Sequence, residues 1–594
     1  MGSATALRSV VRVVRNLLLA GSMGRQHLRH TGAKAISVTL RRSPPWVRGA
    51  AARQRVRADV AGLARAADSD FSGARQILSH AAGHLPASGR AAEVQRARLV
   101  SAAIVLHDTT LAAELWPSAT STDIRASSRQ RRLLALLYME RGDIGAAIEQ
   151  VRAGTDSSSR ALLARVSGEA EVLQAQLLRQ ELKNRTTVRI TAGTISTVLH
   201  VVSAALPDQQ TGYTIRTQGI ASAQREAGID AQVVSRLGFP VDIGVIGAAS
   251  RCVFDAVPYH HMLPSWRMPP IGPRRQIVAA EQLARHVERE APQVLHAHSK
   301  HENGQIALMV GHRLGLPVVY EARGFLEETW RHAGGSETSD FYRWTRDAET
   351  LCMMQSDAVT TLSTAMAADI VARGVDSAKV SVMPNAVSQN FCAHIDDGEK
   401  AAARGGLGIP DEAIVFGTVT TLNDYEGLDT VIAAMRHLRD PRMILLVVGS
   451  GQAKAALQRA ASPLGDRVRF TGRVQHENVR DYLAAMDIFV VPRKATPVTC
   501  LVPPIKPLEA MGLGIPVLAS DLPPLVEIVQ PGAFGAIATA EDKISWAEQM
   551  TTLGYAPQDV HELGARAARF VRRQRTWKAT VAKYTAIYES VAHC

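Results

Sequence analysis

Apolar runs and amphipathic stretches alternate along the last two thirds of the chain. The run "STVLHVVSAALP" at 196–207 ends in turn residues, as buried parallel strands often do. A helix-like stretch follows at 216–228, and strand-like and helix-like segments continue to alternate after it. A second series of the same kind begins near Ile414. The pattern predicts two tandem α/β halves with doubly wound parallel sheets, at 186–390 and 391–594.

Residues 59–185 show a different pattern, rich in Ala, Leu, Arg and Gln and almost without strand signals. In "RRLLALLYMERGDIGAAIEQVRAG", from Arg131 to Gly154, a Leu/Tyr face leads to a break at Gly142 and then to a second apolar stretch. This pattern predicts a helix–turn–helix that resembles one tetratricopeptide-type unit. No second copy follows, so a helical domain that binds a protein partner and a plain helical spacer are both open.

The segment 1–58 is expected to be a basic leader. Residues 1–60 contain eleven Arg and Lys34 against Asp59 alone, and these account for most of the net charge of +13. Valines and leucines between 10 and 18 fall on one side of a helical projection, with arginines on another. Such a cationic amphipathic helix is typical of anionic membrane surfaces. A solvated basic tail is an alternative. Nucleic-acid binding is not expected, because the leader has a single aromatic residue for stacking.

Length and composition place the chain among globular proteins. Its 594 residues and 46% hydrophobic content predict two or three domains with substantial cores. Five widely spaced cysteines without a CxxC motif argue against a disulfide framework or a zinc site, and favour a reducing compartment. No apolar run reaches about 18 residues, the length a membrane span needs. We therefore expect a cytoplasmic protein that contacts the membrane face, if at all, through its leader.

The stretch "VPPIKPLEAMGLGIPVLASDLPPLVEIV" at 502–529 mixes prolines and glycines with apolar residues. It predicts a loop, a helix that begins near Pro507 and stops at Gly514, and then a strand. The N–H groups at the helix start favour a bound diphosphate, and Lys506 stands beside them. Glu509 in the first turn can accept two hydroxyl hydrogen bonds, although many first-turn acids only cap their helix.

Several short motifs, in this order and at these intervals, resemble the nucleotide-sugar glycosyltransferases of the GT-B fold, specifically the retaining family 4, or group 1. They are "LPDQQTGYTIRTQGIASAQREAGIDAQVVSR", "VLHAHSKHENG", "SVMPNAV", "GTVTTLNDYEGLD", "LLVVGSGQ", "KPLEAMGLGIPVLASD" and the terminal "RTWKATVAKYTAIYESV". The resemblance covers 196–590 and leaves 1–185 outside it. It implies two Rossmann-like domains, with the acceptor on the N-terminal one, the donor on the C-terminal one and a terminal crossover helix.

The resemblance implies a donor site centred on the second half. There the matching Glu509 holds the nucleotide ribose, and Lys506 with its helix start holds the diphosphate. Arg493 and Lys494 are further sources of positive charge. The predicted donor-binding residues are Gly212, Asn423, Arg493, Lys506, Glu509 and Gly512.

The acceptor side is expected at the strand ends of the first half. His298 ends the strand "VLHAH", and the matching family histidine lies near the transferred sugar; a satisfied polar residue is the plainer alternative. Asn385 ends the half and is expected to stabilise the turn between the domains. The predicted acceptor-binding residues are Thr211, Glu321 and Arg323, and the predicted catalytic residues are His298, Lys506 and Glu509.

This chain departs from the family pattern at three places. An acid usually stands eight or nine residues before the ribose-binding Glu, where this chain has Leu501 and Cys500. The usual basic pair at the start of the second half is replaced by "TLNDYEGLD", a version also found in a branch of the family. Pro523 and Pro524 replace the usual Gly-Gly. These departures leave the identity of the transferred sugar open. They also keep a catalytically weak or inactive binding scaffold as an alternative function.

The expected reaction is sugar transfer from a UDP- or GDP-sugar to a glycan or lipid-linked cell-envelope acceptor, with retention of configuration. Retention by front-face attack is implied by the resemblance. No cofactor is expected, and no metal, because Asp, Glu and His do not cluster at metal-ligand spacing along the sequence. A dinucleotide oxidoreductase needs GxGxxG after a first strand, which neither half has. A nucleotide-sugar epimerase of the same fold stays open until products are analysed.

Overall fold

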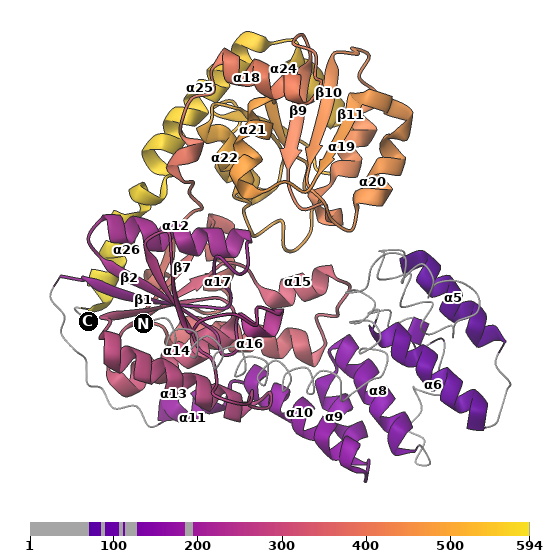
Figure 1. Cartoon of the computed structure of the whole chain (residues 1–594), viewed down its shortest axis with the longest axis vertical. Helices are drawn as coiled ribbons and strands as arrows, with labels where there is room; N and C mark the ends of the chain where they lie inside the picture. The colour runs from indigo at the N-terminus through magenta and orange to yellow at the C-terminus, as the bar shows by residue number, and fades with distance from the viewer. Residues whose placement is uncertain are drawn as a thin grey trace, which may run out of the picture.

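The computed structural model describes residues 71–84, 90–105, 111, 112, 114, 127–183 and 194–592. The basic leader predicted at 1–58 lies outside the described residues. In Figure 1 two α/β domains stand one above the other, and helices from the first part of the chain extend to one side of the lower domain. Among the described residues, no helix is both long and apolar enough to cross a bilayer.

The first part of the chain is helical, as its composition predicts. Its helices are α5 (Phe71–Gly83), α6 (Arg90–Val105), α8 (Ser128–Arg141), α9 (Ile144–Arg152), α10 (Ser157–Leu173) and α11 (Gln176–Lys183). The predicted helix–turn–helix is confirmed: Gly142 ends α8 in the left-handed region at φ 81°. This turn rests on the N-terminal α/β domain, where Gly145 N donates to Asp340 Oδ2 at 2.8 Å.

We expect Gly142→Ala to destabilise this turn. An added Cβ would lie 2.9 Å from Ser339 Oγ and 3.0 Å from Phe341 Cβ, and the left-handed backbone disfavours any residue with a Cβ. The free energy of unfolding of the helical region should fall by about 1–2 kcal/mol. Limited proteolysis measures this as faster cleavage within 127–183. Gly83→Ala is the control: an added Cβ there meets nothing within 4 Å, so cleavage within 127–183 should stay unchanged.

The N-terminal α/β domain is built on an eight-stranded sheet in the order β3-β4-β2-β1-β5-β6-β7-β8, in which only the β3–β4 pair is antiparallel. Its strands are β1 (Thr197–Val202), β2 (Asp230–Ser235), β3 (Arg251–Phe254), β4 (Val257–His261), β5 (Val294–His298), β6 (Val318–Ala322), β7 (Ala358–Thr361) and β8 (Val380–Val382). Its main helices are α12 (Gly212–Glu226), α13 (Pro273–Glu290), α14 (His301–Leu314), α15 (Leu326–His332), α16 (Asp340–Gln355) and α17 (Thr364–Ala372). The strand at 196–207 and the alternation after it are thus confirmed.

The C-terminal α/β domain has a six-stranded parallel sheet in the order β11-β10-β9-β12-β13-β14. Its strands are β9 (Ile414–Val419), β10 (Met443–Val448), β11 (Val468–Gly472), β12 (Ile488–Val491), β13 (Val517–Ser520) and β14 (Gly535–Ala538). Its helices are α18 (Asp397–Gly406), α19 (Leu428–Met435), α20 (Lys454–Ala461), α21 (Val479–Ala484), α22 (Lys506–Gly512), α23 (Pro523–Val529), α24 (Lys543–Gly554) and α25 (Pro557–Gln574). The helix predicted near Pro507 is α22.

The chain crosses between the two α/β domains twice. The outward crossing near Val387 and the return crossing at Thr576 lie side by side in a parallel bridge. The last helix, α26 (Trp577–Ala592), then packs on the N-terminal domain, as Figure 1 shows in yellow. Gly219 of α12 makes room for it, because a Cβ there would lie 2.3 Å from Trp577 Nε1. The last two helices therefore pack on different domains: α25 on the C-terminal domain and α26 on the N-terminal one.

Candidate functional site

A cavity of about 340 Å³ lies between the two α/β domains. From the N-terminal domain it is lined by the first turn of α12 and by Arg323, which follows β6. From the C-terminal domain it is lined by the carboxyl ends of β9 and β12 and by the start of α22. Parallel α/β sheets bind their ligands beyond the carboxyl ends of the strands, so this cavity is the expected place for a substrate.

Arg493 and Glu426 form an ion pair in the wall of the cavity. The guanidinium Nη2 donates to Glu426 Oε1 at 2.9 Å and Nε donates to Oε2 at 3.2 Å, which is a bidentate arrangement. Nη1 also donates to the carbonyl of Val502 at 3.1 Å. Glu426 thus neutralises and orients Arg493, so the pair as a whole offers an anionic ligand little net charge.

Lys506 and Glu509 form a second pair at the start of α22. Lys506 Nζ lies 2.9 Å from Glu509 Oε2, and both residues line the cavity. The lysine side chain is partly exposed, whereas the glutamate side chain is only 3% exposed. The lysine is the accessible partner of the pair, and the buried carboxylate needs a replacement partner if the lysine leaves it. Lys506 can therefore turn to an incoming anion when hydroxyl groups of the same ligand donate to Glu509.

Arg323 lies on the opposite wall of the cavity, which Arg216 also lines. Four of its five N–H groups are used within the protein: Nε donates to Glu321 Oε1 at 2.7 Å, and Nη1 donates to Tyr213 O and Thr217 Oγ1. Nη2 donates to His298 Nδ1 at 2.6 Å and keeps one N–H in reserve. The guanidinium is therefore fixed in position while one donor remains for a ligand.

Glu321 is completely buried beneath Arg323 and is the counterion of two arginines. Arg216 Nε donates to Oε1 at 3.0 Å and Tyr584 OH donates to Oε2 at 2.6 Å. Burial alone would raise the pKa of Glu321, but Arg216 and then Arg323 outweigh it and hold the pKa well below its usual value. The carboxylate is therefore ionised and shared between fixed cations.

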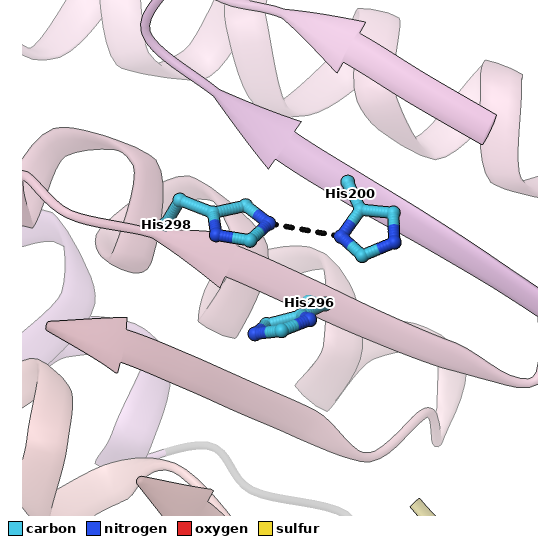
Figure 2. Close-up of side chains that lie close together, drawn as sticks. All are labelled: His200, His296 and His298. Carbon is cyan, nitrogen blue, oxygen red and sulfur yellow. Dashed lines mark hydrogen bonds between the residues drawn. The ribbon is translucent and has the colours of Figure 1, made fainter. Parts of the chain in front are cut away.

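Three histidines continue this network into the sheet. His200 comes from β1, and His296 and His298 come from β5. His298 Nε2 and His200 Nδ1 are 2.9 Å apart, and a dashed line marks this contact in Figure 2. Because a guanidinium only donates, His298 Nδ1 accepts from Arg323, and the neutral ring carries its proton on Nε2. Burial is the first cause that lowers the pKa of all three rings, so they are neutral near pH 7.

The hydrogen bonds then run in one direction through the core. His298 donates to His200, and His200 Nε2 donates to Gln224 Oε1 at 2.7 Å. Gln224 Nε2 donates to Tyr588 OH at 2.9 Å, and that hydroxyl donates to His296 Nδ1 at 2.8 Å. The chain of donors connects Arg323 at the cavity with helix α26.

The spacing of Asp, Glu and His along the sequence predicted no cluster, but histidines from different strands and helices lie close together in the structure. Among the described residues, two groups have ligating atoms within 4.8 Å of one another: His200 with His296 and His298, and a second group in another part of the N-terminal domain. The first group does not suit a metal ion. Two buried guanidiniums, those of Arg216 and Arg323, share a single carboxylate beside it, so a divalent cation would be repelled.

The structure brings five of the predicted site residues to the cavity: Gly212, Arg323, Arg493, Lys506 and Glu509. A Cβ on Gly212 would meet only Ile505 Cδ1, at 3.9 Å, so the backbone there is open to a ligand. Asn385 also lines the cavity and ties the domains together, because its Nδ2 donates to Pro503 O at 3.0 Å.

The other predicted site residues lie outside the cavity lining. His298 and Glu321 are completely buried in the network described above. Thr211 caps α12 by accepting from Thr214 N, and Asn423 donates to Tyr425 OH. Gly512 gives close packing at the interdomain crossing, where a Cβ would lie 2.2 Å from Phe391 O. Lys494 is paired with Asp424 and Asp429 and does not line the cavity.

Two residues that were not predicted from the sequence, Arg216 and Tyr584, join the site to the interdomain crossing. Arg216 Nη2 donates to Met383 O at 2.7 Å and to Tyr584 OH at 2.8 Å, across 368 residues of sequence in the second case. An arginine on the buried side of the helix after the first loop was the available signal. Tyr584 gave none, because a tyrosine in an amphipathic helix is ordinarily part of the core.

The segment at the position of the missing family acid lies between the domains. Leu501 packs against the hydrophobic core of the N-terminal domain, and its carbonyl accepts from Ser363 Oγ at 2.8 Å. Cys500 packs against the core of the C-terminal domain instead. Where the family pattern has an acid, this chain therefore has apolar side chains that pack against the two domains.

Two family models match the chain, and together they span more than half of it. Residues 211–386 match the model "Glycosyl transferase 4-like domain". Residues 413–554 match the model "Glycosyl transferases group 1". The first match lies within the N-terminal α/β domain and the second within the C-terminal one.

Curated relatives include a GDP-mannose-dependent monoacylated alpha-(1-6)-phosphatidylinositol monomannoside mannosyltransferase of Corynebacterium glutamicum. It is 30% identical over 196 residues, which is 32% of this chain and 51% of the relative. A D-inositol 3-phosphate glycosyltransferase of Stackebrandtia nassauensis is 28% identical over 276 residues, 44% of this chain and 60% of the relative. The chain thus matches between half and three fifths of the length of these relatives.

Solved structures share the fold at low identity. Sucrose-phosphate synthase from Thermosynechococcus elongatus has a TM-score of 0.55 at 18% identity, covering 66% of this chain and 98% of that one. The protein Alr3699/HepE of Anabaena in complex with UDP has a TM-score of 0.53 at 16% identity, covering 66% of this chain and all of the other. The paired α/β domains are therefore those of the GT-B fold.

Proposed function

Because this chain belongs to the group 1, or family 4, glycosyltransferases, we propose that it transfers a sugar from a nucleotide-sugar donor to a glycan or lipid-linked acceptor. The observation that carries the proposal is the cavity between the two domains, where Arg323, Arg493 and Lys506 approach from both sides. A nucleoside diphosphate sugar carries two negative charges on its diphosphate, and such a site provides cations for it.

The donor occupies the C-terminal side of the cavity in this proposal. Glu509 accepts hydrogen bonds from the ribose hydroxyls, a role that its place in the cavity lining at the start of α22 permits. Lys506 turns from Glu509 to the diphosphate, and Arg493, neutralised by Glu426, contributes its remaining N–H donors rather than net charge. These cations stabilise the charge that grows on the leaving diphosphate, without a resident metal ion. A UDP- or GDP-sugar is the proposed co-substrate.

The acceptor approaches from the N-terminal side. There Arg323 offers its remaining N–H, and the open backbone at Gly212 faces the donor across the cavity. We propose transfer with retention, in which the acceptor hydroxyl loses its proton to the departing phosphate. The Corynebacterium relative acts on a phosphatidylinositol mannoside, which supports a lipid-linked acceptor of the cell envelope.

A second candidate function is a catalytically weak scaffold that binds nucleotide sugars or partner proteins. Two observations favour it. Leu501, at the place of the missing acid, packs partly buried against the core of the N-terminal domain, and Arg493 is already neutralised by Glu426. The helical region at 127–183 would then serve as the partner-binding part.

Acceptor-dependent release of nucleoside diphosphate separates the two candidates. The full chain is incubated with UDP-, GDP- and ADP-sugars, with and without a lipid extract of bacterial envelopes. A transferase releases the diphosphate from one donor only when the extract is present, and the anomeric configuration of the product is read by NMR. Donor binding without any release would favour the scaffold.

A further inference from the structure

A second cluster of histidines and an acid lies between strand β4 and helix α13. His260 stands near the end of β4, and His286 and Glu290 stand on α13. One ligating atom of each lies within 4.8 Å of those of the other two. None of the three lines the cavity between the domains, and the proposed transfer reaction uses none of them.

The two histidines have buried nitrogens without partners. His260 is 7% exposed and His286 is 5% exposed, and the Nε2 atom of each has no hydrogen-bond partner. Their ring centroids are only 4.2 Å apart. A buried imidazole nitrogen that pairs with nothing costs free energy, so two of them side by side indicate a missing ligand. The histidines of β1 and β5 differ, because hydrogen bonds occupy nearly all their nitrogens.

The geometry of the cluster fits a metal ion. His286 and Glu290 are one helical turn apart and project from the same face of α13, toward His260. Two imidazoles and one carboxylate, with a fourth position left for water, are a donor set that Zn²⁺ prefers. The side chain of Glu290 is 21% exposed, so the cluster opens to solvent on that side.

A cation already bridges two of the three groups. Arg289 Nη2 lies 2.6 Å from His286 Nδ1, and Arg289 Nε donates to Glu290 Oε1 at 2.8 Å. Because the guanidinium only donates, the neutral ring of His286 then carries its proton on Nε2 and cannot ligate a metal through that atom. The arginine and the metal therefore compete for the cluster.

Little holds Arg289 in this position. Its side chain is 62% exposed, so it can turn into solvent at small cost. Arg251, on the exposed side of β3, is the other positive charge facing the cluster, and solvent screens it. Burial first of all lowers the pKa of both histidines to about 4, so their rings are neutral near pH 7, as metal ligands must be.

We propose that His260, His286 and Glu290 bind one divalent transition-metal ion of the Zn²⁺ class, which displaces Arg289 and ties β4 to α13. The two unpaired histidine nitrogens and the carboxylate of Glu290 coordinate the ion, and a water molecule is its fourth ligand. Its role is structural, because it joins β4, the strand next to the edge of the N-terminal sheet, to helix α13.

Equilibrium dialysis of the chelator-treated full chain against Zn²⁺ tests the site. We expect one ion per chain, and a loss of affinity of roughly tenfold or more in each of His260→Ala and His286→Ala. His561→Ala, at an exposed position on α25, is the control and should change nothing. No uptake by the parent chain, or uptake that survives both cluster variants, would overturn the proposal.

A gain of affinity is the sharper outcome, because a misfolded variant cannot mimic it. Arg289→Ala removes the competing guanidinium, and Zn²⁺ should then bind roughly 3- to 10-fold more tightly. Arg285→Ala is the matched control: its side chain is 69% exposed on the same helix, is paired with Glu281 and has no contact with the cluster. Equal affinity in the Arg289→Ala and Arg285→Ala chains would contradict the competition and with it the proposed site.

Discussion

Replacing Glu321 by Gln is expected to lower the free energy of unfolding of the N-terminal domain by about 3–5 kcal/mol. The substitution keeps the shape of the side chain but removes the charge that Arg216 and Arg323 share in the interior. Two guanidiniums without a counterion are costly here, because their side chains are only 2% and 5% exposed and water solvates them poorly. Urea denaturation of the full chain measures the loss. Glu562→Gln, at an exposed ion pair with Arg566, is the control and should leave stability unchanged.

The same carboxylate predicts how stability depends on pH. The folded-state pKa of Glu321 lies well below its usual value, because two arginines outweigh the effect of burial. Its contribution is therefore complete above the unfolded-state pKa, near 4.3, and is lost as the pH falls toward the folded-state value. The parent chain should lose this stability only below about pH 4, whereas Glu321→Gln should lack that part of the acid transition. Identical acid profiles would contradict the assignment of Glu321 as the shared counterion.

Glu509→Ala is expected to weaken binding of UDP or GDP by roughly 10- to 100-fold and to leave binding of inorganic diphosphate unchanged or tighter. The carboxylate is proposed to hold the ribose, so its loss removes hydrogen bonds that only a nucleoside makes. It also frees Lys506, whose Nζ lies 2.9 Å from Glu509 Oε2, for the diphosphate. Isothermal titration calorimetry with the two ligands separates these effects.

Lys506→Ala provides the matched comparison. Lys506 is assigned to the diphosphate, so its removal should weaken both the nucleotide and inorganic diphosphate by similar factors. The two variants thus differ in which ligand they lose, although the two side chains touch each other. If Glu509→Ala weakens both ligands equally, the ribose assignment is wrong and the residue only orients the lysine.

The sequence predicted the fold through local signals. Most predicted strands of the two halves are short apolar runs buried on both faces, as in β5, β6 and β10, whereas β8 and β11 are mainly half-buried. The helix at "KPLEAMG" is marked by Pro507 inside its start and by Gly514, with φ 89°, just after its end. The turn at Gly142 was equally visible, because a glycine between two apolar helical stretches has few other interpretations. Such features depend on neighbours within a few residues, which the sequence shows directly.

The candidate site could be predicted only in part, since its other half depends on contacts between distant segments. Lys506 and Glu509 are three residues apart on one helix, so their pairing follows from the sequence. The pairing of Arg216 with Tyr584 depends on how α26 returns to the first domain, which no spacing reveals. His298 was expected near the substrate because the sequence shows that it ends a strand. The sequence does not show that the guanidinium of Arg323 lies against it.

Thermal unfolding of the full chain against UDP-, GDP- and ADP-sugars tests the central claim most directly. A ligand that binds only the folded state raises the unfolding midpoint by mass action. We predict a rise with one nucleotide sugar that exceeds the rise with its bare nucleotide, and that disappears in Glu509→Ala. If no nucleotide sugar shifts the midpoint of the parent chain, the cavity between the domains is not a donor site.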